Sequence, residues 1–109
     1  MPPGREQIGV RPAIVLGLPE RLGKPRFPVV LVAPLTTDRG QDWALVSPAL
    51  YPRLAVGLGG LPSPSIVLLD QTRFLSVSRI SAWLGALEPM FFQQIRDTLV
   101  KMMSYPASE

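Results

Sequence analysis

An arginine held by a proline opens the first apolar segment of the chain. Arg11 precedes Pro12, and residues 12–17 read PAIVLG. Proline disfavours the helical conformation in the residue before it, so we expect Arg11 to be extended, at the mouth of a buried strand. A guanidinium keeps its charge and binds two oxygens at once, which suits a phosphate group. The alternative is an ordinary ion pair with Glu6 or Asp70.

Two hydroxyl groups follow the second apolar segment. Residues 29–35 read VVLVAPL and predict a buried strand, and Thr36 and Thr37 come directly after it. Hydroxyls at a strand end can donate hydrogen bonds to the oxygens of a phosphate. The alternative is that residues 36–42 (TTDRGQD) form a plain turn, in which threonine and aspartate are common.

A third polar group ends the segment 65–71. That segment reads SIVLLDQ, so Asp70 and Gln71 close it, and Arg73 comes two residues later. A glutamine amide binds the edge of a base, and an arginine binds a base or a phosphate. The alternative is a solvated strand end with an Asp70–Arg73 pair. All three sets of polar residues lie at strand ends, which points to one place in the fold.

The composition limits the chemistry that such a site performs. The chain has no cysteine and no histidine, which excludes disulfides, thiolate metal sites and the usual general base at neutral pH. Catalysis would depend on Arg, Glu, Asp, Lys, Thr, Ser or Tyr. The eight acidic residues form no cluster in the sequence. We therefore expect neither a metal nor a cofactor.

The charge is positive and unevenly distributed. The net charge is +3, and residues 1–79 hold nine Lys/Arg against five Asp/Glu. An acidic partner such as a nucleic acid or an acidic protein is favoured, on a face built from the first three quarters of the chain. MPPGREQ at the start lacks the apolar region of a signal peptide, and no apolar stretch approaches the roughly 18 residues of a membrane helix. We therefore expect a cytoplasmic protein with no membrane segment.

Short apolar segments between loops rich in proline and glycine indicate a mainly β fold. With 109 residues, we expect one domain, 1–109, around one modest core. In 88–103 apolar residues recur at helical spacing, and Pro89 suits the first helical position. The predicted fold is a small β-barrel closed by this C-terminal helix. Its strands are expected at 12–17, 29–35, 43–48, 53–58, 65–71 and 73–77, the last continuing 65–71 or pairing beside it.

These segments resemble the motifs of a known family. GREQIGVRP (4–12) fits the pattern Gly-x-Glu-Gln-x-Gly-x-Arg-Pro of the MazF/PemK-type endoribonuclease toxins of type II toxin–antitoxin systems. VVLVAPLTT and GLPSPSIVLLDQTRFLSVSRI are similar to the second and third motifs, and LGALEPMFFQQIRDTLVKMM to the closing helix. The resemblance covers about 4–103. It implies an SH3-like barrel of the CcdB/MazF type and a homodimer. It also implies metal-independent cleavage of single-stranded RNA, including mRNA, to a 2′,3′-cyclic phosphate and a 5′-hydroxyl. A cognate antitoxin would bind across the RNA groove.

The motif positions imply roles for individual residues. Arg11 matches the catalytic arginine of the family, Thr36 its catalytic threonine or serine, and Glu6 an acidic position beside them. Gln71 matches a position that contacts RNA. Arg73 and Thr37 are expected to contact RNA because of their residue types at the same strand ends. Because arginine stays protonated in proteins, we expect Glu6 to take the 2′-proton. The alternative is that Glu6 only orients Arg11.

The loop 17–28 carries a positive charge of its own. With three prolines and two glycines, we expect it to be mobile, with Leu18, Leu22 and Phe27 as its apolar anchors. Its basic residues are expected to attract RNA phosphates or an acidic antitoxin segment; they are Arg21, Lys24 and Arg26. The alternative is a plain solvated hairpin loop.

Other expectations concern assembly and alternative functions. Apolar residues in excess of what a small barrel covers favour a homodimer; they are Trp83, Phe91, Phe92, Met102 and Met103. Family members usually carry a further strand before the first motif, whereas only three residues precede Gly4, so an unpaired barrel edge is expected. The alternative functions are a non-catalytic gyrase poison of the CcdB type and a barrel that has lost its activity. Poisons of that type lack the arginine and threonine motifs.

Overall fold

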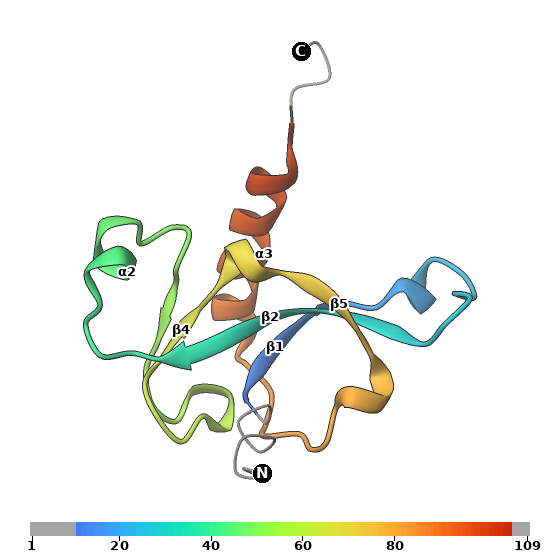
Figure 1. Ribbon diagram of the computed structural model, residues 1–109, viewed down its shortest axis with the longest axis horizontal. Helices are drawn as coiled ribbons and strands as arrows, with labels where there is room; N and C mark the ends of the chain where they lie inside the picture. Colours follow the sequence, from blue (N-terminus) through green and yellow to red (C-terminus); the bar gives the residue numbers. More distant parts are fainter. Residues whose placement is uncertain (1–10, 106–109) are drawn as a thin grey trace, which may run out of the picture.

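The longest strand lies at the centre of the sheet (Figure 1). The computed structural model describes residues 11–105. Its strands are β1 (Ala13–Gly17), β2 (Val29–Thr37), β3 (Arg53–Leu54), β4 (Ser65–Val67) and β5 (Arg73–Ser76). Its α-helices are α2 (Asp42–Val46) and α3 (Pro89–Met103). Single turns of 3-10 helix are η1 (Pro19–Arg21), η2 (Leu58–Gly60), η3 (Leu69–Gln71) and η4 (Val77–Arg79).

Strand β2 is shared by two antiparallel sheets. Its residues Leu31 and Val32 pair with both β1 and β5, so those two strands lie on opposite edges. Beyond Val32, the edge of β2 that binds β5 binds β4 instead, through residues 35–37 of β2. Strand β3 pairs with the other edge of β4. Turn η3 separates β4 from β5. Just before this turn, the Leu68 N–H donates to the Pro34 carbonyl at 2.9 Å. The result is a curled half-barrel with a C-terminal helix.

Alternate residues of β2 project to two different faces of the sheet. Leu31, Ala33 and Leu35 point to one face, which we call the core face. Val30, Val32, Pro34 and Thr36 point to the other, which we call the Thr36 face. The core face packs against α3 through Ile95 and Leu99, two residues at i, i+4 spacing. The buried core cluster on this side consists of Leu16, Ala33, Leu35, Leu54, Leu61, Val67, Leu69, Ile95 and Leu99.

The structure confirms the strands expected at 12–17 and 29–35 and the helix expected at 88–103. Pro89 occupies the first turn of α3, where its missing N–H costs no hydrogen bond. Residues 36–37 differ from the expected turn, because the ladder to β4 continues through them and they end β2. The turn therefore begins at Asp38.

The strand predicted at 43–48 is wrong, because residues 43–46 belong to α2. Only Ala44 of α2 is buried, whereas Trp43, Leu45 and Val46 are exposed. A strand with one face on the core would bury alternate residues. Short apolar runs do not distinguish the two structures by periodicity alone, and here tertiary packing selects the helix.

Three other strand boundaries were also predicted incorrectly. The segment 53–58 keeps only the two residues of β3, because Gly57 adopts a left-handed conformation with φ of 94°. The segment 65–71 ends as a strand at Val67, where η3 follows. Strand β5 pairs with β2 instead of continuing β4 or pairing beside it. The first break follows from the local conformation of Gly57, whereas the other two differences depend on long-range partners that local sequence does not specify.

Two glycines bring distant backbone segments together before α3. Gly60 has φ of 77°, and a Cβ at this position would overlap the carbonyl oxygen of Leu84. A Cβ on Gly85 would lie 2.9 Å from the Gly59 carbonyl oxygen. This contact between η2 and residues 84–85 fixes the segment that leads into α3.

We expect Gly60→Ala to destabilise the protein much more than Gly40→Ala. Both glycines have left-handed φ values, of 77° and 72°, but a Cβ on Gly40 would meet no atom within 4 Å. The conformational strain, about 1–2 kcal/mol, is common to both variants, whereas only Gly60→Ala forces the backbone at Leu84 to move. Urea unfolding measures the difference. Equal losses in the two variants would show that the contact with Leu84 contributes nothing.

Candidate functional site

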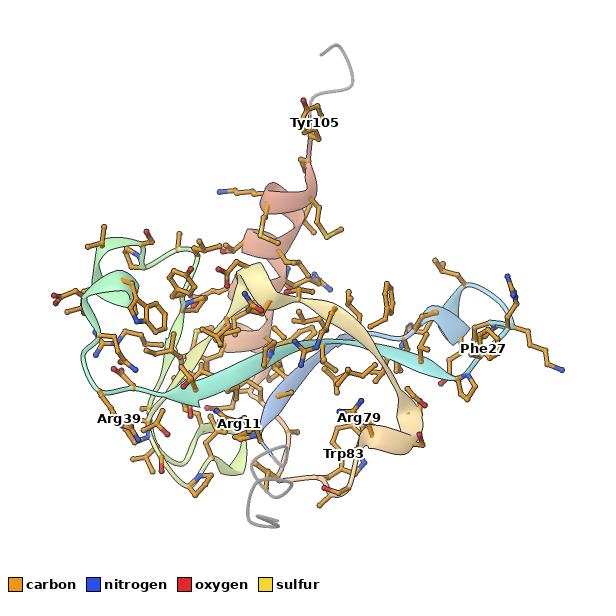
Figure 2. The ribbon with its side chains drawn as sticks, in the orientation of Figure 1. Arg11, Phe27, Arg39, Arg79, Trp83 and Tyr105 are labelled. Carbon is orange, nitrogen blue, oxygen red and sulfur yellow. The ribbon has the colours of Figure 1, made fainter. Side chains whose placement is uncertain are left out.

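The pairing of β1 with β2, continued by two residues, sets Arg11 opposite Thr36. Ala13 is the partner of Pro34, and the Leu35 N–H donates to the Pro12 carbonyl at 3.0 Å. Arg11 lies two residues before β1, and continuing the same register sets it opposite Thr36. Residues directly opposite in an antiparallel pair project to the same face. The register therefore assigns the guanidinium and the hydroxyl expected to act together to the same face, the Thr36 face. Arg11 lies at the N-terminal end of β1 (Figure 2).

The two adjacent threonines lie on opposite faces. Thr36 is half-buried and pairs with Ile66 of β4, whereas Thr37 is exposed and pairs with Ser65. The Thr37 carbonyl accepts a hydrogen bond from the Gln41 amide at 3.0 Å. The structure therefore brings Thr36, and not Thr37, to the face shared with Arg11.

The register also adds an arginine that sequence reasoning missed. Arg53 of β3 pairs with Ile66, which in turn pairs with Thr36, so Arg53 is on the same face. No motif marked Arg53, and its position follows only from the order of β2, β4 and β3. Its Nε donates to Asp38 Oδ2 at 2.7 Å, which gives an ion pair close to the end of β2.

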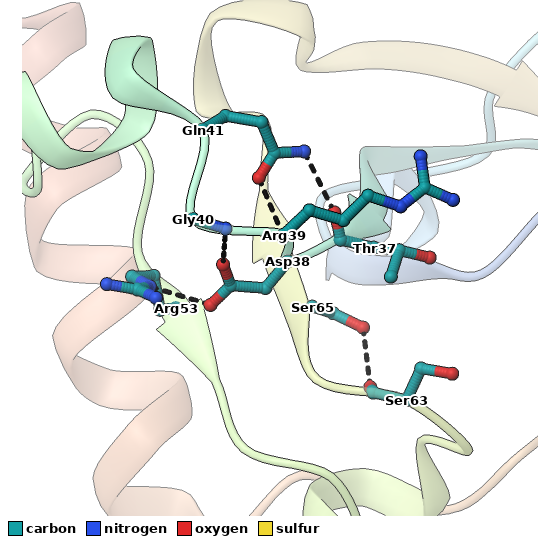
Figure 3. A network of polar contacts seen from close by, with 8 residues as sticks. All are labelled: Thr37, Asp38, Arg39, Gly40, Gln41, Arg53, Ser63 and Ser65. Atoms are coloured by element: carbon teal, nitrogen blue, oxygen red, sulfur yellow. Dashed lines mark hydrogen bonds and ion pairs between the residues drawn. The ribbon is translucent and has the colours of Figure 1, made fainter.

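The turn after β2 is held by a network of polar contacts (Figure 3). Asp38 Oδ1 also accepts from the Gly40 N–H at 3.0 Å, and Gln41 Oε1 accepts from the Arg39 N–H at 2.8 Å. The hydrogen bond from Arg53, followed by the one from the Gly40 N–H, lowers the pKa of Asp38 below its ordinary value. Asp38 therefore remains a carboxylate at neutral pH and serves to hold Arg53.

A groove beside Pro34 of β2 and turn η3 contains two of the expected RNA-binding residues, Gln71 and Arg73. It has a volume of about 430 Å³. Its lining includes Pro34, Trp43, Tyr51, Asp70, Gln71 and Arg73. Turn η3 ends the strand at this point and places Asp70 and Gln71 beside one another at the groove.

Tyr51 and Trp43 belong to this groove and were not predicted from the sequence. The Tyr51 hydroxyl donates to Asp70 Oδ2 at 2.7 Å, and this bond to a carboxylate raises the pKa of Tyr51. The Trp43 and Tyr51 rings meet edge to face, with centroids 4.9 Å apart and planes at 79°. Asp70 thus bonds Tyr51, and the alternative Asp70–Arg73 pair is not among the ion pairs of the described residues. In the sequence, the presence of two aromatic residues in 43–51 was the only feature that could have indicated this part of the groove.

The basic loop is not next to Arg11. Loop 17–28 follows the C-terminal end of β1, at the end of the molecule opposite α2 (Figures 1 and 2). Arg21, Lys24 and Arg26 are exposed. The expected anchoring is wrong, because Leu22 is 96% exposed and Phe27 is also exposed, with the Arg26 guanidinium 5.5 Å from its ring centroid.

Some expectations lie outside what the structure describes. Glu6 and most of the first motif precede Arg11, the first described residue. Within residues 11–105 no group of three or more acidic, histidine or cysteine side chains is arranged to hold a metal ion. In the same range, no helix is long and apolar enough to cross a membrane.

Comparison with known proteins identifies the family. The family model described as PemK-like, MazF-like toxin of type II toxin–antitoxin system matches residues 1–103. The chain belongs to this family. The resemblance drawn from its motifs is therefore confirmed. Toxins of the MazF/PemK family are endoribonucleases, and type II systems pair each toxin with an antitoxin.

A solved structure supports the same assignment. The chain is similar to the Mycobacterium tuberculosis toxin MazF-mt6, with 25% sequence identity and a TM-score of 0.61. The match covers 84% of this chain and 83% of the MazF-mt6 chain. Among curated proteins, no match was found. The half-barrel with its C-terminal helix is thus the fold of a MazF toxin.

We expect the Asp38–Arg53 pair of this MazF-family chain to stabilise it only above acidic pH. The folded state lowers the pKa of Asp38 below 3.8, so its contribution is present at neutral pH. That contribution disappears as the pH falls through the folded-state pKa. Asp38→Asn should lower the unfolding temperature at pH 7, and the difference from wild type should vanish in acid. Thermal unfolding by circular dichroism from neutral to acidic pH measures it.

The control for this experiment is Glu20→Gln. Glu20 is exposed in η1 and makes no hydrogen bond or ion pair within the described part of the chain. Its variant should unfold with the wild type at pH 7. An Asp38→Asn variant whose deficit persisted undiminished in acid would show that the charge of Asp38 is not what stabilises the turn.

Proposed function

We propose that this chain is a sequence-specific, metal-independent endoribonuclease toxin, neutralised by a cognate antitoxin. Its substrate would be single-stranded RNA, including cytoplasmic mRNA, cut to a 2′,3′-cyclic phosphate and a 5′-hydroxyl. The observation that carries the proposal is the β1–β2 register, which, continued to Arg11, sets it opposite Thr36 in a chain of the MazF/PemK family. Nothing in the fold favours the alternative of a CcdB-type poison, which lacks this pair.

The proposed reaction uses the RNA itself as the nucleophile. The ribose 2′-oxygen forms a bond to the adjacent phosphorus, and the bond from that phosphorus to the 5′-oxygen breaks. The 2′-proton passes to a base, and the departing 5′-oxygen takes up a proton. No metal is required, but the crowded phosphorane carries additional negative charge. Groups already in place around it therefore determine the rate.

Arg11 and Thr36 suit that charge. The guanidinium of Arg11 stays protonated and can donate two hydrogen bonds to phosphoryl oxygens. The Thr36 hydroxyl, half-buried in β2, can donate a third hydrogen bond from a strand position that needs little reorganisation. Losing one such donor typically lowers the rate by about 10²–10³.

The general base must be a group that can accept a proton and is not already held in another contact. Arginine does not accept a proton, and the carboxylate that directly follows β2, Asp38, is held by Arg53 with a lowered pKa. We therefore assign the 2′-proton to Glu6 of the first motif. Its alternative role is to orient Arg11.

The path of the RNA follows from the remaining polar groups. Gln71 and Arg73 at the groove are the proposed contacts next to the cleaved phosphate. Arg21, Lys24 and Arg26 would extend the contact along the backbone or bind an acidic segment of the antitoxin. Thr37, on the core face, is proposed only as a minor contact. The homodimer stays a prediction, supported by exposed apolar side chains such as Trp83, which is 74% exposed.

The first prediction for this function concerns cleavage in EDTA. The wild type should cut single-stranded RNA with EDTA present and leave 2′,3′-cyclic phosphate ends. Arg11→Ala should abolish cleavage, and Thr36→Ala should reduce the rate by about 10²–10³, because each removes a donor to the phosphorane. Thr37→Ala should have a smaller effect. Gel analysis of end-labelled RNA, with enzymatic tests of the new ends, measures all four.

A matched control is Arg96→Ala, which removes an exposed arginine from α3 and should cleave like the wild type. Complete loss of wild-type activity in EDTA, restored by magnesium, would contradict the metal-independent reaction. A Thr37→Ala variant slower than Thr36→Ala would contradict the assignment of Thr36.

The second prediction concerns loop 17–28. Replacing Arg21, Lys24 and Arg26 together with serine should weaken RNA binding and flatten its dependence on salt, by about 0.7 in log–log slope for each lost phosphate contact. Because all three side chains are exposed, the unfolding temperature should be nearly unchanged. Fluorescence anisotropy at several salt concentrations measures the slope.

The control for the loop variant removes the same charge elsewhere. Arg79, Arg96 and Lys101 are exposed and lie outside the loop, so their triple serine variant separates net charge from local contact. An equal change of slope in the two triple variants would rule out a specific role for the loop.

A further inference from the structure

The aromatic pair in the groove suggests how one base of the RNA is held. We propose that the groove binds a single unpaired base, stacked on the exposed surface of Trp43, beside the phosphate contacted by Arg11 and Thr36. This inference takes the nature of the ligand, single-stranded RNA, from the proposed function. It adds Trp43 and Tyr51 to the residues that hold the substrate.

The groove adjoins the proposed catalytic pair. Pro34 lines it and is two residues from Thr36 on the same face of β2. Pro34 also pairs with Ala13, two residues from Arg11. Arg73 pairs with Val32 and so projects to this face as well. A nucleotide chain that reaches Arg11 and Thr36 with its phosphate would therefore pass the groove with a neighbouring base.

Trp43 is available for stacking and is already braced. Its side chain is 46% exposed, although it belongs to a helix whose only buried residue is Ala44. The Tyr51 ring packs edge to face against Trp43, and Tyr51 is itself held by its 2.7 Å hydrogen bond to Asp70. An exposed indole that is held on one side gives up little conformational freedom when a base stacks on it.

The rest of the lining suits a base and its phosphate. The volume of about 430 Å³ lies in the range of small-molecule sites. The Gln71 amide offers both a donor and an acceptor to a base edge, and Asp70 offers an acceptor. Arg73 is exposed and has no hydrogen-bond or ion-pair partner within the described residues, so its charge is available to a phosphate. Apolar, polar and cationic groups thus converge on one groove.

The test uses Trp43 as its own reporter. The chain has two tryptophans, so Trp83→Phe leaves Trp43 as the only indole. The probes are a nine-nucleotide 2′-O-methyl oligocytidylate, which lacks the nucleophilic hydroxyl, and a base-free oligomer with the same phosphates. We expect the first to quench Trp43 emission. The second should leave the emission unchanged and bind about tenfold more weakly, because stacking is lost while phosphate contacts remain.

Variants of the groove separate stacking from folding. Trp43→Ala should bind both oligomers with the weaker affinity and an unaltered salt dependence, whereas Trp43→Phe should retain most of the preference for the oligomer with bases. Tyr105→Ala removes an exposed aromatic side chain at the far end of α3 (Figure 2) and should behave as the wild type. If Trp43→Ala does not fold, the comparison of the two oligomers on the Trp83→Phe protein remains decisive.

Each outcome distinguishes this inference from the proposed function. Unchanged Trp43 emission on binding, equal affinity for the two oligomers, or binding of neither would overturn the stacking site. Base-dependent quenching in a protein that fails to cleave RNA would support the stacking site and overturn the nuclease. RNA cleavage by the wild type, together with an unchanged base preference in Trp43→Ala, would support the nuclease and overturn the stacking site.

Discussion

The backbone hydrogen bonds of β2 fix the relative positions of β1, β4 and β5. One edge of β2 binds β1, and the other binds β5 and then β4, with η3 at the change from one to the other. Because side chains alternate with a period of two, a slip of one residue in any of these ladders would move a side chain to the opposite face. The apposition of Arg11 and Thr36 therefore depends on the β1–β2 register. That register is pinned by the same core residues, Ala33 and Leu35, that pack against α3.

Two arginines of the Thr36 face, Arg53 and Arg73, have different roles. Arg53 is committed to Asp38 and holds the turn after β2, and the pair is partly exposed. Such a pair adds little stability, but it fixes geometry where the strand ends. Arg73 has no such partner among the described residues and opens onto the groove. A chain without histidine or cysteine thus builds its candidate site from permanent charges and hydroxyls, which suits the positioning of a phosphate better than proton shuttling.

Much of the fold could be predicted from the sequence, because β1, β2 and α3 carry local signals. The run at 12–17 is bounded by Pro12 and Gly17, and α3 combines Pro89 with apolar residues at helical spacing. The predictions failed where a distant partner decides the structure. Trp43 was assigned to a strand because WALV is apolar, yet Ala44 is the only buried residue of α2. Arg53 and Tyr51 carry no motif and join the site only through the pairing of β3 with β4 and the bond to Asp70.

The contribution of α3 to the core has a consequence for the order of events during synthesis. Ile95 and Leu99 complete a cluster that otherwise consists of residues from the sheet and its turns. A ribosome produces Arg11 and Thr36 long before it produces those two residues. A two-stranded hairpin by itself is at best marginally stable in water. The nascent chain therefore carries both proposed catalytic groups without the packed layer that holds them in register. On the proposed function, the catalytic pair is therefore expected to be held in register only after the last helix has folded onto the sheet.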